Sequence, residues 1–265
     1  MANKKSKKPT IAVYKFSSCD GCQLGILNLE DELLDLVGVV EIAHFLEARR
    51  QVLPGPYDIG LVEGSVSTPE EVQRIKEIRH SCGILIALGT CATAGGVQGL
   101  RNFEDLEELI NIVYEHPEFI DSLPNSTRVA DHVKVDYELW GCPVNKYQVV
   151  EALVAILQNR RPNLPQYSLC LECKRLGNPC VTVAYGMPCL GPIVRAGCGA
   201  LCPSNGRGCY GCFGPMDTAE VDAFIPVLKS HQRYPGEAVR LLRTISGYAP
   251  AFVDAAELIL AQEEE

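Results

Sequence analysis

The sequence predicts an α/β protein. A mainly parallel sheet domain, residues 1–160, is expected to precede a small irregular domain with C-terminal helices, residues 165–265. Three observations support this prediction. Short apolar segments alternate with segments of helical spacing up to about residue 160. A polar segment from Arg160 to Pro165 follows and is expected to form a stiff linker. Eight of the thirteen cysteines then fall within residues 170–212, a stretch with little periodicity.

The elements of the first domain alternate regularly. Strands are expected at 10–16, 39–45, 58–63, 83–88 and 133–140, and helices at 24–37, 69–80, 104–114 and 145–157. Thr68, Pro69 and Glu71 form a helix-start signal, and Asn145 is expected to cap the last of these helices. A glycine-rich turn is expected after residue 88, and two or three helices within 217–262, for example 250–262. The alternation is typical of a flavodoxin-like sheet with helices on both faces.

Four cysteines follow the ends of predicted strands. Cys19 and Cys22 follow the first strand, Cys91 follows strand 83–88 and Cys142 follows strand 133–140, while Glu63 ends strand 58–63. The ends of parallel strands meet at one edge of a sheet, where such folds bind ligands. The four thiols are therefore expected to converge on one metal cluster. The alternative is that they are small buried apolar residues, as cysteines often are.

The other eight cysteines form two further sets of four. Their series is C-x2-C-x6-C-x8-C-x8-C-x3-C-x6-C-x2-C. The simplest pairing gives one set of Cys170, Cys173, Cys180 and Cys189, and another of Cys198, Cys202, Cys209 and Cys212. Interleaving stays open, because two-cluster ferredoxins exchange their last ligand between sites. Twelve ligands in three sets predict three iron–sulfur clusters and a protein that conducts electrons.

Zinc is the alternative metal. Cys170–Cys173 and Cys209–Cys212 are C-x2-C pairs of the kind that zinc ribbons use. One zinc ion would leave four of these eight thiols unexplained, and two would still leave the upstream set unexplained.

Composition excludes several classes of function. A net charge of −9 argues against nucleic-acid binding. No apolar run is long enough to span a bilayer, so no direct membrane anchor is expected. The basic N-terminus lacks the apolar region and the adjacent arginines of export signals, which predicts a cytoplasmic location. In that reducing compartment, cysteines bind metal more often than they form disulfides.

Short motifs surround the cysteines in both domains. In the first they are Cys19-Asp20-Gly21-Cys22, Val62-Glu63-Gly64, Gly89-Thr90-Cys91 and Gly141-Cys142-Pro143. In the second they are Cys170-Leu171-Glu172-Cys173, Pro188-Cys189-Leu190-Gly191-Pro192, Ala196-Gly197-Cys198-Gly199, Cys202-Pro203 and Cys209-Tyr210-Gly211-Cys212. Together they resemble the small subunit of a nickel–iron hydrogenase over about residues 10–215. The chain is most similar to the cytoplasmic branch, which includes sulfhydrogenase delta subunits and small subunits of methyl-viologen-reducing hydrogenases.

The resemblance implies an electron-relay subunit of a hydrogenase, an oxidoreductase that acts on H2. By this resemblance, three 4Fe–4S clusters would be held as follows: the proximal one by Cys19, Cys22, Cys91 and Cys142, the medial one by Cys198, Cys202, Cys209 and Cys212, and the distal one by Cys170, Cys173, Cys180 and Cys189. The nickel–iron active site would lie in a separate large subunit, so no residue of this chain is expected to be catalytic. Electrons from H2 oxidation, or towards proton reduction, would pass the three clusters in turn.

Two positions depart from the periplasmic members of that family. Those members have His where this chain has Cys170, and Pro where it has Cys202. Their medial cluster contains three iron atoms. A fourth thiol here implies a four-iron medial cluster. Ligation by cysteine alone also lowers the potential, because imidazole ligation raises it. Low potentials suit exchange with NAD(P) or ferredoxin through further iron–sulfur or flavin subunits.

Two other functions remain as alternatives. A complex I-type iron–sulfur subunit of a quinone-linked assembly shares the first domain, but that family has adjacent cysteines in place of C-x2-C and lacks the eight-cysteine segment. A zinc-stabilised interaction protein is the second. The chain has neither the Rossmann nor the P-loop glycine spacing, so no nucleotide site is predicted and the terminal acceptor stays open.

The remaining chemical groups have simpler interpretations. Cys82 is expected to be a buried structural thiol, and the five histidines are scattered. Trp140 is expected either near the proximal cluster or in the core, and Phe213 and Tyr210 are candidates to shield the medial site from water. Glu63 could belong to a proton path, but a structural role in capping N–H groups is favoured.

Overall fold

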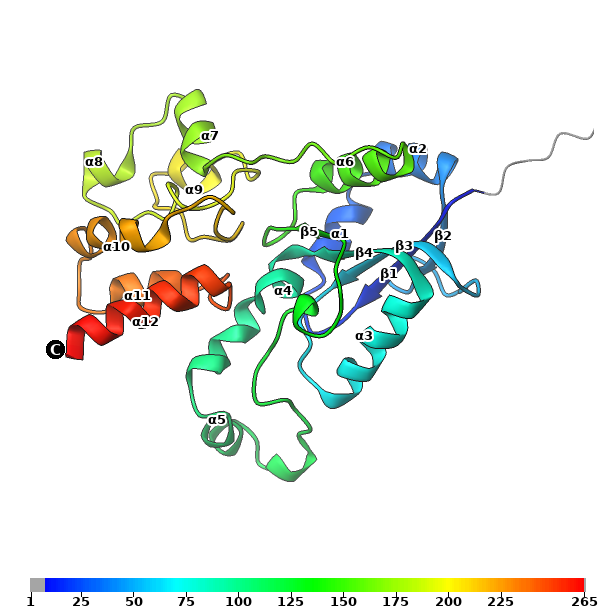
Figure 1. Ribbon diagram of the computed structural model, residues 1–265, viewed down its shortest axis with the longest axis horizontal. Helices are drawn as coiled ribbons and strands as arrows, with labels where there is room; N and C mark the ends of the chain where they lie inside the picture. The colour runs from blue at the N-terminus through cyan, green and yellow to red at the C-terminus, as the bar shows by residue number, and fades with distance from the viewer. Residues whose placement is uncertain (1–7, 265) are drawn as a thin grey trace, which may run out of the picture.

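The computed structural model describes residues 8–264 and contains a parallel sheet of five strands (Figure 1). The strands are β1 (Thr10–Lys15), β2 (Glu41–Phe45), β3 (Tyr57–Glu63), β4 (Cys82–Leu88) and β5 (Tyr137–Leu139). Their order across the sheet is β2-β1-β3-β4-β5, which is the order of flavodoxin-like folds. The predicted fold class is confirmed. Residues 1–7, which include most of the basic N-terminus used to predict the location, lie outside the described part.

Helices cover both faces of this sheet. On one face α1 (Gly21–Leu27), α2 (Asp31–Val39) and α6 (Lys146–Leu157) pack on strand residues such as Ile11 and Val13. On the other face α3 (Pro69–Ser81) packs on Ala12 and Tyr14. Successive residues of β1 thus face opposite sides of the sheet, as the pleat of a strand requires.

Helix α3 begins at the predicted signal, and this start also fixes the loop that leads to Cys19. The Thr68 side chain accepts a hydrogen bond from the Glu71 N–H at 3.2 Å, and the Glu71 carboxylate accepts one from the Thr68 N–H at 3.2 Å. The same carboxylate accepts from the Ser17 hydroxyl at 3.2 Å. The capping box therefore joins the start of α3 to the loop after β1.

The predicted helix 24–37 is wrong in one respect, because two helices occupy this segment. Helix α1 ends at Leu27 and α2 begins at Asp31, with Glu30 between them at a φ of 55°. The Asn28 carbonyl accepts a hydrogen bond from Lys146 Nζ at 2.7 Å. The break lets Leu29 become fully buried in the core.

Two other predicted elements differ from the structure. The turn expected after residue 88 begins instead with a short helix, α4 (Gly89–Ala94), and the chain turns only at Gly95 and Gly96. The strand predicted at 133–140 is reduced to β5. The Asp136 side chain accepts hydrogen bonds from the Leu85 N–H at 2.8 Å and from Arg79 at 2.7 Å. A side chain thus takes the place of backbone pairing at the start of this strand.

The segment between β4 and β5 holds the remaining elements of the first part: the 3₁₀ helices η1 (Val97–Phe103), η2 (Pro117–Phe119) and η3 (Val129–Asp131), and α5 (Leu106–Val113), close to the predicted 104–114. Helix α6 begins at the predicted cap, where the Asn145 side chain accepts a hydrogen bond from the Tyr147 N–H at 2.9 Å.

The cysteine-rich part contains three short helices and three longer C-terminal ones. They are α7 (Leu169–Arg175), α8 (Val181–Tyr185), α9 (Leu201–Ser204), α10 (Val221–Ser230), α11 (Glu237–Arg243) and α12 (Pro250–Glu264). The three C-terminal helices agree with the predicted number. Their core includes Leu190, Phe213 and Phe252, and within residues 8–160 only Ala94 and Trp140 join it. Among the described residues, no helix combines the length and the apolar character needed to cross a membrane.

The linker after α6 is held by a single carboxylate. Glu151 accepts two hydrogen bonds from the Arg160 guanidinium, at 2.6 and 2.8 Å, and one from the Asn163 N–H at 2.8 Å. The bonds from Arg160 lower the pKa of Glu151 to about 2. This contact is therefore complete above the ordinary value of 4.5 and is lost only as the pH falls through about 2.

We expect Glu151→Gln to loosen the linker, because a neutral amide accepts weaker bonds from a guanidinium than a carboxylate does. Trypsin should then cut after Arg160 several-fold faster than in the unchanged chain at pH 8. Glu257→Gln, which removes the charge of an exposed carboxylate on α12, is the matched control. Equal cleavage rates in all three proteins would contradict this role for Glu151.

Candidate metal centres

Four cysteines lie beyond the carboxyl ends of the strands. Cys19 is in the loop after β1, Cys22 is in the first turn of α1, Cys91 is in α4 and Cys142 follows β5. Their charges act on one another: Cys22 interacts with Cys91 and Cys142, and both Cys91 and Cys142 interact with Cys19. The structure therefore brings together the four thiols that were expected to converge at this edge, called here the edge set.

Burial controls the protonation of the edge set. It raises the pKa of Cys22 and Cys142, and raises the pKa of Cys91 to about 11. The thiolate, which is the form that binds metal, is therefore disfavoured until a cation or a hydrogen-bond donor offsets its charge. One donor is in place, since the Val144 N–H lies 3.4 Å from Cys22 Sγ.

Two glycines let the backbone approach these sulfurs. Gly89 has a φ of +79°, and a Cβ atom there would overlap Cys22 Sγ. Gly96 has a φ of +66°, and a Cβ atom there would lie 2.5 Å from Cys91 Sγ. Both positions require glycine on conformational and steric grounds.

Glu63 acts as a cap within the edge set. Its side chain is buried, with one oxygen accepting from the Cys22 N–H at 3.0 Å and the other from Gln23 Nε2 at 2.7 Å. Burial raises the pKa of Glu63, and the hydrogen bonds from Gln23 and Cys22 oppose this shift. The favoured structural role of Glu63 agrees with these contacts. Gln23 was missed in the sequence, because a buried glutamine in an apolar helix gives no periodic signal.

The cysteine-rich segment forms two more groups. The charge of Cys170 interacts with Cys189, Cys173 and Cys180. A Cβ atom at Gly191 would lie 3.3 Å from Cys189 Sγ and 3.5 Å from Cys170 Sγ, so these two sulfurs face the same point. We call the group of Cys170, Cys173, Cys180 and Cys189 the outer set.

The last four cysteines form the middle set: Cys198, Cys202, Cys209 and Cys212. Cys212 interacts with Cys198 and Cys202. Cys209 interacts with Cys189 of the outer set first, and then with Cys212 and Cys198. Burial raises the pKa of Cys212 to about 12 and places that of Cys209 far above its ordinary value. The middle and outer sets therefore meet at Cys209 and Cys189, and the simplest pairing of the eight thiols stays a prediction.

Backbone N–H groups point at sulfurs in both of these sets. Cys189 Sγ accepts from the Gly191 N–H at 3.4 Å and from the Cys209 N–H at 3.2 Å. Cys209 Sγ accepts from the Gly211 N–H at 3.4 Å. At Cys180, hydrogen bonds from the first turn of α8, led by the Val183 N–H, lower the pKa.

The three sets lie in series, with the middle set between the other two. The Cys142 N–H of the edge set donates to the sulfur of Cys212. The bond from the Cys209 N–H to Cys189 Sγ joins the middle set to the outer set. Cys209 is buried, whereas Cys19 at one end and Cys180 at the other are exposed.

Phe213 separates the edge set from the middle set. A Cβ atom at Gly141, next to Cys142, would lie 2.9 Å from the Phe213 ring, and one at Gly197, next to Cys198, would lie 2.7 Å from it. The ring is buried, as expected of a residue that excludes water from the middle set. Tyr210 differs from that expectation, because it is 38% exposed and lines a surface cavity.

Other residues considered in the sequence stand apart from the three sets. Cys82 is buried in the core against Gly60 of β3, as expected. Trp140 packs in the core of the C-terminal part, under the guanidinium of Arg195, which lies 4.6 Å from its ring. Within residues 8–264 all thirteen cysteines are free thiols, and no three His, Cys, Asp or Glu side chains form a group that could hold a single metal ion.

Three comparisons describe what the chain is similar to. Residues 19–156 match the family model described as NADH ubiquinone oxidoreductase, 20 Kd subunit. The sulfhydrogenase 2 subunit delta of Pyrococcus furiosus is 39% identical over 89% of this chain and 98% of its own length. A vhu-type F420-non-reducing hydrogenase of Methanocaldococcus jannaschii has a subunit that is 36% identical over 78% of this chain and 82% of its own length. A chain of an NAD+-reducing [NiFe]-hydrogenase crystal structure, in the H2-reduced state, has a TM-score of 0.56 and 29% identity over 60% of this chain and 96% of its own.

The fold and the thiol sets define a class of protein, the flavodoxin-like subunits with cysteines at the carboxyl edge of the sheet. The chain belongs to the family of the NADH ubiquinone oxidoreductase 20 Kd subunit. The resemblance to nickel–iron hydrogenase small subunits that the motifs predicted is confirmed by these relatives and by the shared fold.

We expect Gly89→Ala to disrupt the edge set, because the added Cβ would overlap Cys22 Sγ and the residue would be held at a φ of +79°. Iron bound per chain should fall by about a third, the share of one set in three. Gly38→Ala in α2 is the control, since a Cβ there meets nothing within 4 Å. Undiminished iron in Gly89→Ala would show that the edge set does not depend on this close approach.

Proposed function

We propose that this protein is the electron-relay subunit of a cytoplasmic nickel–iron hydrogenase complex. Each cysteine set holds one 4Fe–4S cluster: the edge set the proximal one, the middle set the medial one and the outer set the distal one. The nickel–iron centre belongs to a separate large subunit. The relatives support this proposal, because they are named as subunits of hydrogenases and align with the chain across the cysteine-rich segment.

The serial arrangement of the sets is the observation that carries the proposal. Single hydrogen bonds, from Cys142 to Cys212 and from Cys209 to Cys189, connect neighbouring sets. A chain of redox centres needs short separations inside the protein and access at its two ends. Cys209 of the middle set is buried, and Cys19 and Cys180 at the two ends of the series are exposed.

The donor sets fit iron–sulfur clusters better than zinc. Four thiolates bound to one zinc ion at about 2.3 Å bring their sulfurs to about 3.8 Å from one another. Among the described residues no three of these thiols are placed to hold one metal ion, although their charges interact. An iron–sulfur cluster is larger and bridges thiolates that lie farther apart, and when bound it supplies one-electron transfer.

The residues around the sulfurs have defined tasks. N–H groups such as those of Val144, Gly191 and Gly211 stabilise negative sulfur, and thereby set the potential of whatever the sulfur binds. Glu63 holds the first turn of α1, so that Cys22 keeps its orientation. Phe213 keeps water out between the edge and middle sets.

Exposed apolar side chains support a partner at each end of the series. Leu24 in α1 and Tyr147 in α6, 50% and 59% exposed, follow the cysteines of the edge set, where the large subunit would dock. Val183 and Tyr185 in α8, 85% and 59% exposed, follow Cys180 of the outer set. We assign that end to a further iron–sulfur or flavin subunit linked to NAD(P) or ferredoxin, because ligation by cysteine alone favours low potentials.

The complex I-type alternative is not favoured. The family model ends at residue 156 and covers only the first part. The hydrogenase subunits also cover the segment that carries the middle and outer sets. A quinone-linked subunit with one cluster would leave these eight cysteines without a role.

We expect Cys91→Ser in the purified complex to reduce H2-dependent dye reduction to background, because the edge set loses a thiolate. Cys82→Ser is the matched control, since Cys82 is a buried thiol outside all three sets. Iron per chain should drop only in Cys91→Ser. Full dye reduction by that variant would refute the proximal assignment.

We expect Cys202→Pro to convert the medial cluster to a three-iron form that electron paramagnetic resonance detects in oxidised protein. Cys202 lies in the first turn of α9, where proline is tolerated. Iron should fall by about one atom in a dozen. Cys202→Ala should give the same signal without proline, and unchanged stoichiometry in both variants would mean that Cys202 is no ligand.

A further inference from the structure

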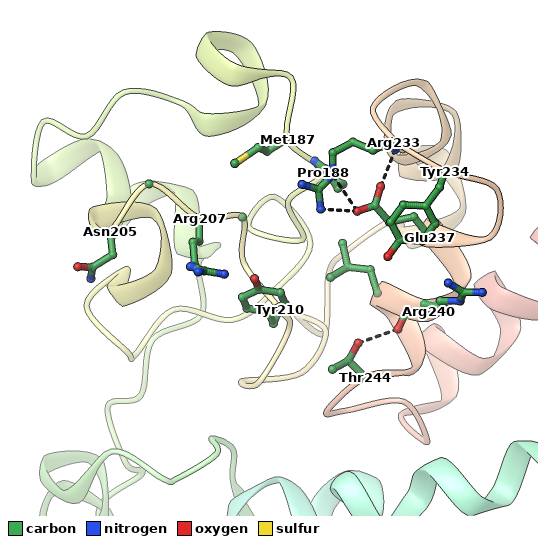
Figure 2. A pocket seen from close by; sticks show the side chains of 13 residues that line it. Met187, Pro188, Asn205, Arg207, Tyr210, Arg233, Tyr234, Glu237, Arg240 and Thr244 are labelled. Carbon is green, nitrogen blue, oxygen red and sulfur yellow. Dashed lines mark hydrogen bonds and ion pairs between the residues drawn. The ribbon is translucent and has the colours of Figure 1, made fainter.

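A cavity of about 550 Å³ lies between the loop that leads to Cys209 and helix α11 (Figure 2). Arg207 and Tyr210 come from the loop, and Arg233, Tyr234, Glu237 and Arg240 come from α11 and the turn before it. The volume falls within the range of about 300–1,000 Å³ that is typical of small-molecule sites.

This cavity has an excess of positive charge in an acidic chain. Arg233 donates to Glu237 at 2.7 and 3.1 Å, so these two residues neutralise each other. Within residues 8–264 the guanidinium groups of Arg207 and Arg240 make no hydrogen bond or ion pair, and Arg240 lies only against the ring of Tyr234, at 5.4 Å. Three arginines and one glutamate leave a net charge of 3 − 1 = +2 in the cavity, whereas the whole chain carries −9.

Two tyrosine rings also line the cavity. Tyr210 and Tyr234 are 38% and 45% exposed, and both line the cavity (Figure 2). Exposed rings of this kind can stack against a planar group, and the bases of nucleotides bind proteins in this way. Guanidinium groups without a carboxylate partner are well suited to phosphate.

We propose that this cavity binds a nucleotide, with its phosphates at Arg207 and Arg240 and its base against a tyrosine. No glycine-rich loop is involved, which is why the sequence predicted no nucleotide site. The ligand could be free in solution, or it could be the nucleotide portion of a cofactor that a neighbouring subunit carries.

A simpler role for these arginines would be to offset the charge of the cysteines. The main causes of the pKa shifts of Cys189 and Cys209 argue against this role. Burial comes first for both thiols, followed by backbone N–H groups and other cysteines. Arg207 and Arg240 are not among them.

The test is calorimetric titration of ADP into the full chain loaded with iron and sulfide under anaerobic conditions. We expect Arg240→Gln and Arg207→Gln each to weaken ADP binding at least about tenfold, the effect of losing one charge-assisted contact. Arg175→Gln is the matched control, because Arg175 is also exposed and lies 5.5 Å from a tyrosine ring, that of Tyr167, outside the cavity. It should change the affinity less than about twofold.

Two further ligands, inorganic pyrophosphate and FAD, show which part of the nucleotide is recognised and where it comes from. Inorganic pyrophosphate should bind more weakly than ADP, because it lacks a base to stack. If FAD binds more tightly than ADP, the ligand is the cofactor of a partner subunit. If ADP binds more tightly than FAD, the ligand is a free nucleotide. No ADP binding at millimolar concentration, equal losses in Arg175→Gln, or pyrophosphate binding as tight as ADP would each overturn the proposal. Iron content and circular dichroism of every variant establish that it is folded and loaded.

Discussion

The offsetting of negative charge on buried sulfur is the constraint on which the rest of this structure depends. Burial raises the pKa of thiols in all three sets, for example those of Cys91 and Cys212 to about 11 and 12. A metal-bound thiolate at such a position needs N–H groups close to the sulfur. The chain meets this need with loops in which backbone faces sulfur, as at Val144 and Gly191. These loops contain few apolar side chains. Helices α10 and α12 therefore supply much of the hydrophobic core on which the loops pack.

Much of the first part could be predicted from the sequence, because its signals are local. The strands are continuous apolar runs, and Thr68 and Asn145 mark the helices that they cap. Once the strands are parallel, their carboxyl ends share one edge, so the convergence of Cys19, Cys22, Cys91 and Cys142 follows from topology alone. No long-range contact had to be known for that step.

The features that were wrong or missed depend on contacts between distant segments. The break between α1 and α2 is accompanied by Lys146, more than a hundred residues away, binding the Asn28 carbonyl. The shortening of β5 reflects the Asp136 side chain taking over the Leu85 N–H. The order of the three sets was implied by the resemblance and not by the spacing of the cysteines; in the structure it is supported by the bond from Cys142 to Cys212, which joins the two halves of the chain. Neither spacing nor periodicity carries information of this kind.

The same few residues join the two parts of the chain and fix the distance between the edge and middle sets. Phe213 lies between Gly141 and Gly197, and Trp140 packs against Gly214 within the C-terminal core. Thr90, beside Cys91, donates a hydrogen bond to the Cys212 carbonyl at 2.6 Å. Electron transfer slows steeply as the separation of two redox centres grows. A shift in the packing between the two parts would therefore change the rate of electron transfer even with every ligand in place. The proposed function therefore depends on the packing between the two parts as much as on the cysteines themselves.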